Sequence, residues 1–163
     1  MIRDATPADA PAIAAVYNHY VERSIATFEE VAVSADEMAR RMEPAQGRTP
    51  FLVAEDDAAV VGYAYACPFN TRAAYRHTRE ITVYLHPERT GRGHGTALYR
   101  ELLDRLKTQG IHAVIGGVSL PNPASVALHE KLGFTKVAEF PEVGRKFDRW
   151  IAVGYWQLTG LTD

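Results

Sequence analysis

The chain has 163 residues, of which 47% are hydrophobic, 10% aromatic and 23% charged, and its formal net charge is −2. These proportions describe one globular domain over residues 1–163; they exclude a disordered chain and leave little room for two full domains. Cys67 is the single cysteine, which excludes an intramolecular disulfide, and no apolar run approaches the roughly 20 residues that cross a bilayer, so we expect a cytoplasmic protein without membrane contact.

Charge is distributed unevenly along the chain. Residues 70–107 hold eight of the 18 basic residues but only four of the 20 acidic ones. A local basic segment favours a site for a phosphorylated small molecule over a nucleic-acid surface, which usually makes a whole domain basic. On charge alone, an unevenly solvated surface is an equal alternative.

The N-terminal part predicts a short strand followed by two helices. A strand over residues 2–5 leads to Thr6–Asp9, which has the N-cap, early proline and acidic partner of a helix start. Apolar residues at helical spacing follow over residues 13–20. A second capping box, Ser34–Glu37, opens a short helix that stops before Pro44.

The remaining chain alternates strands and helices without a linker, an internal repeat or a low-complexity stretch. The predicted elements are strands over 51–54, 60–66 and 80–85, a helix over 95–109, a strand over 113–120, a helix over 124–132, and strands over 135–140 and 147–158. The strand–helix–strand unit in the middle requires a parallel pair of strands. The fold class is therefore α/β, with a mixed, mostly antiparallel sheet flanked by helices.

A glycine-rich turn, Thr90-Gly91-Arg92-Gly93-His94-Gly95-Thr96, joins strand 80–85 to the following helix. Its glycines permit close approach of an anion to the unpartnered N–H groups of the helix start, and Arg92 adds positive charge. No Lys-Ser or Lys-Thr follows, which excludes a P-loop, and the sixth position is Thr96 instead of glycine, which excludes a dinucleotide fingerprint. A merely tight connection remains the alternative for the turn alone.

Three segments occur in a definite order and spacing: Thr82–Leu85, the turn Thr90–Gly95, and the stretch Asn122–Phe134 with its sequence Leu-His-Glu-Lys-Leu-Gly-Phe at the end. Together they resemble the acetyl-CoA-binding core of the GCN5-related N-acetyltransferases (GNAT). Thr27-Phe28-Glu29, Arg72–Glu80 and Gly144–Trp150 further resemble the branch that acetylates phosphinothricin and methionine sulfoximine or sulfone. The similarity extends from Ile2 to Leu158.

The resemblance implies an acetyltransferase fold whose central strands splay apart to admit acetyl-CoA. Backbone groups of Val83 and Leu85 would pair with the pantetheine arm, and an N–H near Leu85 would polarise the thioester carbonyl. The implied cofactor-binding residues are Val83, Tyr84, Leu85, Gly91, Arg92, Gly93, His94, Gly95, Thr96 and Asn122. The alternative for Val83 and Leu85 is that they belong to an ordinary core strand, and the alternative for Asn122 is that it only shapes the turn and caps the helix.

One position departs from the family pattern. Thr90 stands where relatives usually have Gln or Arg, three residues before the central glycine Gly93. Arg89 and Arg92 are close enough to supply charge in its place. The departure therefore concerns the tightness of pyrophosphate binding more than the activity.

Two residues are candidates for acid–base chemistry. Acetyl transfer to an amine needs a base, and Glu80 is the best candidate, because partial burial would raise its pKa above the ordinary value of about 4.3. The alternative is a solvent-facing carboxylate paired with Arg76 or Arg79. His129 stands where many relatives have Tyr and would protonate the departing thiolate, although a histidine held by packing is nearly as good an interpretation.

The acceptor site is expected beside Glu80, where Arg72 would clamp a carboxylate or phosphinate. The implied acceptor-binding residues are Asn70, Thr71, Arg72, Glu80, Ile81, Thr82, Lys146 and Phe147, the last two closing the pocket from the C-terminal segment. Each residue could instead belong to an ordinary surface loop. Phe28 and Tyr75 indicate a small enclosed site, and we expect a homodimer.

The predicted function is acetyl transfer from acetyl-CoA to the α-amino group of a small amino-acid-like acceptor. No metal is expected, because the other histidines show no close ligand spacing and Cys67 has no neighbouring histidine. The alternatives are acetylation of a polyamine or a protein N-terminus, and a non-catalytic sensor that binds acyl-CoA. Arg72 favours an anionic acceptor over a polyamine, and Glu80 with His129 argues against a sensor.

Overall fold

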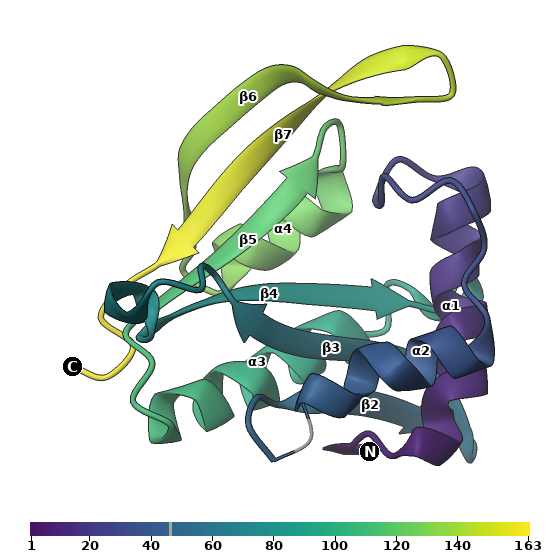
Figure 1. The fold of residues 1–163 in the computed structure, drawn as a ribbon, viewed down its shortest axis with the longest axis horizontal. Coiled ribbons are helices and arrows are strands. Elements are labelled where there is room, and N and C mark those ends of the chain that lie inside the picture. The colour runs from purple at the N-terminus through teal and green to yellow at the C-terminus, as the bar shows by residue number, and fades with distance from the viewer. Residues whose placement is uncertain (46) are drawn as a thin grey trace.

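In the computed structural model, which describes residues 1–45 and 47–163, the strands form one seven-stranded sheet in the order β1-β2-β3-β4-β5-β7-β6 (Figure 1). The strands are β1 (Ile2–Asp4), β2 (Phe51–Asp56), β3 (Ala59–Pro68), β4 (Thr78–Leu85), β5 (Ala113–Ser119), β6 (Thr135–Lys146) and β7 (Arg149–Leu158). The pair β4–β5 is parallel and the other pairs in this sheet are antiparallel. The predicted mixed α/β class is confirmed.

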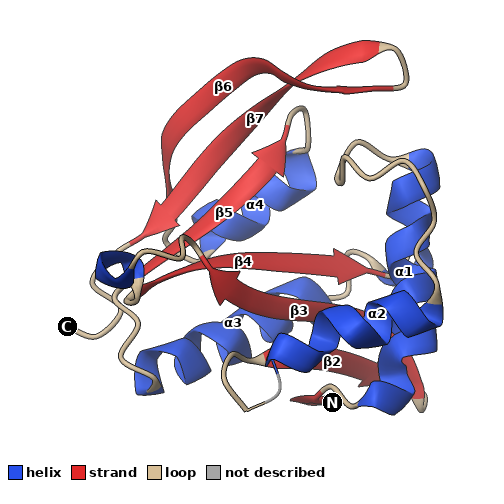
Figure 2. Cartoon of the chain, in the orientation of Figure 1, coloured by secondary structure: helices blue, strands red, loops and turns tan. Residues whose placement is uncertain are grey.

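Helices cover both faces of the sheet (Figure 2). They are α1 (Ala10–Arg23), α2 (Ala35–Met42), α3 (His94–Thr108) and α4 (Pro123–Lys131), with short 3-10 turns at Pro7–Asp9, Glu43–Ala45, Ala73–Tyr75 and Pro87–Arg89. Successive strand residues point to opposite faces, so Val53 packs with α1 and α2 while Leu52 packs with α3. Within the described ranges, no helix is long and apolar enough to span a membrane.

The predicted Thr6–Asp9 capping box forms, whereas at the second helix the Ser34 cap forms and the Glu37 carboxylate pairs with Arg40 and Arg41 instead of closing the box. The Asp9 carboxylate accepts the Thr6 N–H at 2.7 Å, and the Ser34 hydroxyl accepts the Glu37 N–H at 3.1 Å. These side chains satisfy backbone donors at the two helix starts. The first and second helices therefore begin where the sequence indicates.

The two central strands separate soon after they pair. β4 and β5 are in register only over Thr78–Glu80 opposite Ala113–Ile115, and beyond this point the strands diverge (Figure 1). The backbone on that side of β4 therefore has no neighbouring strand. The divergence opens the sheet between the N-termini of α3 and α4 and the end of α1.

The C-terminal hairpin differs from the prediction. β6 continues to Lys146 instead of ending at Phe140, because an irregular register between Phe140 and Gly144 absorbs Pro141 within the strand. Phe147, predicted to begin the last strand, lies in the turn with Asp148, at φ of +51° and +56°. Two successive left-handed residues suit a tight hairpin turn, which usually contains Asn or Gly, so this turn carries no recognisable sequence signal.

Candidate active site

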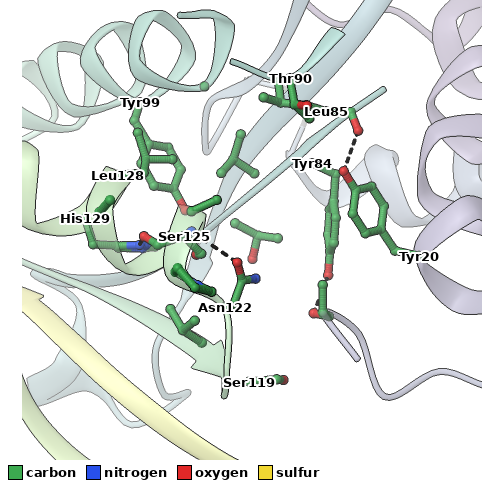
Figure 3. A pocket seen from close by; sticks show the side chains of 18 of the residues that line it. Tyr20, Tyr84, Leu85, Thr90, Tyr99, Ser119, Asn122, Ser125, Leu128 and His129 are labelled. Carbon is green, nitrogen blue, oxygen red and sulfur yellow. Dashed lines mark hydrogen bonds between the residues drawn. The ribbon is translucent and has the colours of Figure 1, made fainter. Parts of the chain in front are cut away.

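A cleft of about 700 Å³ lies where β4 and β5 diverge. It is bounded by β4, by the glycine-rich turn, by the end of α1 with the link that follows, and by β5 with the start of α4 (Figure 3). The lining residues that the sequence predicted are Ile81, Thr82, Val83, Tyr84, Leu85, Gly91, Gly93, Gly95, Thr96, Asn122 and His129.

The cleft-facing edge of β4 presents backbone groups. The His86 N–H donates to the Val61 carbonyl of β3 at 2.8 Å. Because hydrogen-bonded pairs alternate along an antiparallel ladder, the N–H and C=O groups of Val83 and Leu85 point away from β3 and into the cleft. The Tyr20 hydroxyl donates to the Leu85 carbonyl at 2.6 Å (Figure 3), which leaves the Leu85 N–H and both groups of Val83 for an extended ligand.

The glycine-rich turn presents N–H groups to the same cleft. Gly91 and Gly93 have φ of +74° and +86°, a left-handed conformation that glycine adopts without strain. Gly93 immediately precedes α3, so the first N–H groups of that helix have no intrahelical acceptor. Backbone donors and the positive end of the helix dipole therefore converge where an anionic group would lie.

Two predicted cofactor residues of the turn direct their side chains elsewhere. Arg92 is exposed and does not line the cleft, and the His94 ring lies beside Asp56, with Nε2 3.8 Å from Oδ2. Arg89 also pairs with Asp56, at 3.2 Å. Asp56, the last residue of β2, therefore lies beside both Arg89 and His94, so the backbone carries more of the expected anion binding than the sequence indicated.

Asn122 caps α4 and lines the cleft. Its side-chain oxygen accepts the Ser125 N–H at 3.1 Å (Figure 3). The capping role that the sequence left open is therefore present. The side-chain amide nitrogen is still available to a ligand, because the cap uses only the oxygen.

The Glu80 carboxylate lies at the point where β4 and β5 separate. A Cβ built on Gly117 would lie 3.8 Å from Glu80 Oε1 and 3.3 Å from the Tyr155 ring. Glu80 is not itself among the residues that line the cleft, but its carboxylate lies beside Gly117, which does line it and has no side chain. Partial burial raises the pKa of Glu80 above its ordinary value.

The surrounding arginines do not neutralise Glu80. The Arg79 guanidinium donates to the carbonyls of Arg76 and Thr78 at 2.8 and 3.0 Å, and Arg76 donates to the Ala73 carbonyl at 3.1 Å. Among residues 1–45 and 47–163, no ion pair involves the Glu80 carboxylate. Glu80 is thus a partly buried carboxylate suited to accepting a proton.

His129 has the packing role that the sequence left as an alternative. It is 2% exposed, its Nδ1 bonds the Ser125 carbonyl at 2.7 Å, and its ring packs against Tyr99 and Phe134. Nε2 points at Gly116, where a Cβ would overlap the ring. Burial lowers the pKa of His129, which keeps the imidazole neutral. The geometry therefore does not support the expected thiolate-protonating role.

The loop predicted to bind the acceptor, residues 70–72, does not line the cleft. Asn70, Thr71 and Arg72 are exposed between β3 and the 3-10 turn at Ala73–Tyr75, and the Asn70 side chain accepts the Arg72 N–H at 3.1 Å. This bond fixes the start of the loop. The Arg72 guanidinium forms no hydrogen bond or ion pair with another described residue, so it can meet an anion from solution.

Neither Lys146 nor Phe147 lines the cleft. Lys146 is 2% exposed, and its ammonium group donates to backbone carbonyls of α1 and the following link. Phe147 is 50% exposed at the tip of the hairpin. The prediction that these side chains touch the acceptor is wrong for Lys146, because all three of its donors have backbone partners.

The sequence analysis did not identify several residues that line the cleft away from β4 and the glycine-rich turn. These residues lie on α1, the link after it, α3 and β5: Tyr20, Ser24, Ile25, Ala26, Tyr99, Gly117, Val118 and Ser119. The link has no regular structure, and Gly117 has no side chain, so neither gives a motif. The Tyr20 side chain followed the helical apolar spacing and gave no sign of its hydrogen bond to β4.

The residues present fit acetyl-CoA. An extended backbone edge, a helix start without side chains in the way and a cleft through the sheet match the pantetheine arm, the pyrophosphate and the thioester. Among the residues that the structure describes, no group of three or more His, Cys, Asp or Glu side chains could hold a metal ion.

Residues 2–153 match the model of the acetyltransferase (GNAT) domain. The phosphinothricin N-acetyltransferase of Streptomyces viridochromogenes is 40% identical over 156 residues, which cover 96% of this chain and 85% of that protein. The L-methionine sulfoximine/L-methionine sulfone acetyltransferase of Salmonella typhimurium is 37% identical over 158 residues, 96% of this chain and 92% of that protein.

A crystal structure shows the same fold. It is the GNAT superfamily phosphinothricin acetyltransferase from Sinorhizobium meliloti in complex with acetyl-CoA, which matches with a TM-score of 0.94 and 38% identity. The match covers 98% of this chain and 87% of that one.

Proposed function

Since the chain belongs to the GNAT acetyltransferase family, we propose that it transfers the acetyl group of acetyl-CoA to the α-amino group of a small amino-acid-like acceptor. The acceptors would be of the phosphinothricin, methionine sulfoximine or methionine sulfone type. The observation that carries this proposal is the place of the Glu80 carboxylate, which lies beside Gly117 at the edge of a cleft whose lining suits acetyl-CoA.

The cofactor is held mainly by backbone groups. Acetyl-CoA supplies the acetyl group as an activated thioester. Val83 and Leu85 pair with its pantetheine arm as an added strand would, and the N–H groups after Gly93 receive the pyrophosphate. The Leu85 N–H is the donor that would stabilise negative charge on the thioester oxygen.

Glu80 prepares the acceptor. An amino group is mostly protonated at neutral pH and has no lone pair for attack until a base removes a proton. Glu80 takes that proton, directly or through one water, and its raised pKa makes it a stronger base than an exposed carboxylate. Transfer is direct; Cys67 is not used, because burial raises the pKa of its thiol and keeps it protonated.

The acceptor's acidic group meets Arg72. A guanidinium can bind a carboxylate or phosphinate through two parallel hydrogen bonds. Asn70 and Thr71 lie beside it in the same exposed loop. The two relatives are named for amino acids that combine an α-amino group with acidic or strongly polar groups, which supports this class of acceptor.

We further propose that the enzyme is a cytoplasmic homodimer with no bound metal and no nucleic-acid partner. The β6–β7 hairpin extends beyond the body of the domain (Figure 1) and carries large exposed apolar side chains, namely Val137, Phe140, Val143, Phe147 and Trp150. A second copy that covered them would remove an apolar surface from water. The free thiol Cys67 and the net charge of −2 support the compartment and the absence of nucleic acid.

Steady-state kinetics across matched amines test the proposed function. CoA release is measured with phosphinothricin, methionine sulfoximine and methionine sulfone, with their decarboxylated analogues, with spermidine and with a peptide amine. Turnover concentrated on the amino acids supports the proposal. A higher kcat/KM for spermidine or the peptide establishes the corresponding alternative, and tight acetyl-CoA binding without turnover of any amine identifies a sensor.

A further inference from the structure

Lys146 is a charged residue buried at the tip of the long hairpin. Its side chain is 2% exposed, and its Nζ donates to the carbonyls of Tyr20 at 3.2 Å, Ser24 at 2.6 Å and Thr27 at 2.8 Å. The acceptors lie about 120 residues earlier in the chain, at the end of α1 and in the link that follows. All three donors of the ammonium group are therefore used to join the hairpin to this link.

The joined segment is a wall of the cleft. Ser24, Ile25 and Ala26 line it, and the two shorter Lys146 bonds fall on the carbonyls at either end of this segment, Ser24 and Thr27. Inside the segment, the Ala26 N–H donates to the Ser24 hydroxyl at 3.0 Å, and the Ala26 carbonyl accepts the Tyr84 hydroxyl at 3.2 Å. Other contacts also hold the segment, because the Ser24 N–H donates to the Tyr20 carbonyl at 3.1 Å and the Tyr17 and Thr27 hydroxyls lie 2.7 Å apart. Lys146 adds the hydrogen bonds that fasten the segment to the hairpin.

A second contact fastens the hairpin to the same link. The Phe28 ring lies against Gly144, so closely that a Cβ built on this glycine would overlap the ring. Phe28 follows Thr27 directly, and Gly144 precedes Lys146 by two residues. The hairpin therefore holds the link at two adjacent points, one polar and one apolar.

The wall lies on the face of the sheet from which the acceptor must approach. Gly116 faces His129 of α4, so the next residue, Gly117, faces the opposite side, where a Cβ built on it would lie 3.8 Å from Glu80 Oε1. That opposite side is covered by α1 and its link, whereas the N-terminus of α3 approaches from the α4 side. If the pyrophosphate of acetyl-CoA binds at the N-terminus of α3, the cofactor enters from the α4 side of the sheet. The acceptor amine then approaches from the other side, beside Glu80 and Ser24–Thr27.

We propose that Lys146 is a positioning residue for the acceptor, which holds the segment Ser24–Thr27 at the distance from Glu80 that the amine requires. Lysine suits this task because its ammonium satisfies three carbonyls near the negative end of the α1 dipole, and hydrogen bonds offset the cost of burying its charge. The proposal rests on the proposed function, and it gives the predicted acceptor residue Lys146 an indirect role in place of substrate contact.

The test uses three variants of the full chain. Lys146→Met keeps the length of the side chain and removes its donors. Gly144→Ala displaces Phe28 and leaves Lys146 in place, so it perturbs the same wall by a different contact. Lys136→Met is the matched control on the same strand, because Lys136 is exposed and its ammonium group contacts Glu139 and the Trp156 ring, neither of which belongs to the link after α1.

We expect kcat/KM for methionine sulfoximine to fall roughly 10- to 100-fold in Lys146→Met and in the same direction in Gly144→Ala, since a displacement near 1 Å has effects of this size. The dissociation constant of acetyl-CoA, measured by calorimetry, should stay within about twofold, and Lys136→Met should match the wild type. If Lys146→Met does not fold, the result for Gly144→Ala decides.

Three outcomes would overturn the proposal. The first is an unchanged kcat/KM for the acceptor in a Lys146→Met or Gly144→Ala variant that has lost thermal stability. The second is a loss of acetyl-CoA affinity as large as the loss of kcat/KM, and the third is the same loss of kcat/KM in Lys136→Met. Failure of the proposed function is a distinct result, because it appears in the wild type as absence of turnover with every amino acid tested.

Discussion

Replacing Glu80 by glutamine removes the proposed base while preserving the shape of its side chain. The amide cannot accept the proton of the incoming amine, whereas cofactor contacts on the β4 backbone are unchanged. A general base contributes about 10²–10⁴-fold to the rate. At about 1.36 kcal/mol for each tenfold, this corresponds to a transition-state barrier higher by roughly 2.7–5.4 kcal/mol. We therefore expect kcat to fall by that factor and acetyl-CoA affinity to remain within about twofold.

The pH dependence gives a second signature of Glu80. Burial raises its pKa in the folded protein, so wild-type kcat should decline as the pH falls through this raised value, and the Glu80→Gln variant should lack that decline. The free energy of unfolding of the wild type should change in the opposite direction to kcat, and should rise as the pH falls through the raised pKa. Above the raised pKa, Glu80 is charged in both states, but the folded wild type holds this charge in a partly desolvated site and the unfolded chain holds it in water. The Glu80→Gln variant avoids this cost and should therefore be more stable than the wild type at neutral pH. This advantage should vanish as the pH falls toward the ordinary value near 4.3.

Stopped assays of CoA release at saturating acetyl-CoA and acceptor, from pH 5 to pH 9, measure kcat. Thermal unfolding at the same pH values measures stability. A variant with kcat within about threefold of wild type, and with the acidic decline intact, would show that another group removes the proton. A loss of acetyl-CoA binding in the same variant would show that Glu80 supports the cleft instead.

Three further substitutions have distinct expected outcomes. Arg72→Ala should lower kcat/KM for an amino acid by tens-fold, because losing a charge-assisted hydrogen bond costs about 1.5–3 kcal/mol, and kcat/KM for the decarboxylated analogue should change little. Equal losses for the two substrates would mean that Arg72 only supports its loop. Gly93→Val should weaken acetyl-CoA binding in calorimetry, because a β-branched residue is strained at φ of +86°, and an unchanged affinity would remove the turn from the site. His129→Asn should lower the melting temperature yet keep kcat above roughly a tenth of wild type, whereas a true general acid would cost 10²-fold or more.

The sequence predicted elements wherever local chemistry determines them. Thr6 and Ser34 are cap residues with acidic partners three positions later, and both helix starts follow. The glycines of the turn mark positions where φ must be positive, and Gly91 and Gly93 adopt it. Val83 and Leu85 were identified only through the resemblance to the acetyltransferase family, because an open strand edge leaves no local signal in the sequence, and their separation from β5 is seen only in the structure.

Features that depend on distant contacts were not predictable. Lys146 lies in a polar, glycine-containing segment typical of an exposed loop, and its burial depends on carbonyls of a link that gives no pattern of its own. Phe147 takes a left-handed conformation that aromatic residues rarely adopt. His94 turns to Asp56 because the β2–β3 hairpin brings that carboxylate beside the turn, which only the tertiary structure reveals.

The most direct test of the account is the identity and stoichiometry of the product formed from acetyl-CoA and methionine sulfone. Mass spectrometry and NMR of the wild-type reaction should show one equivalent of CoA released for each acetyl group found on the α-nitrogen. CoA release that is the same with and without the amine, or an acetyl group at any other position, would contradict the proposed N-acetyl transfer.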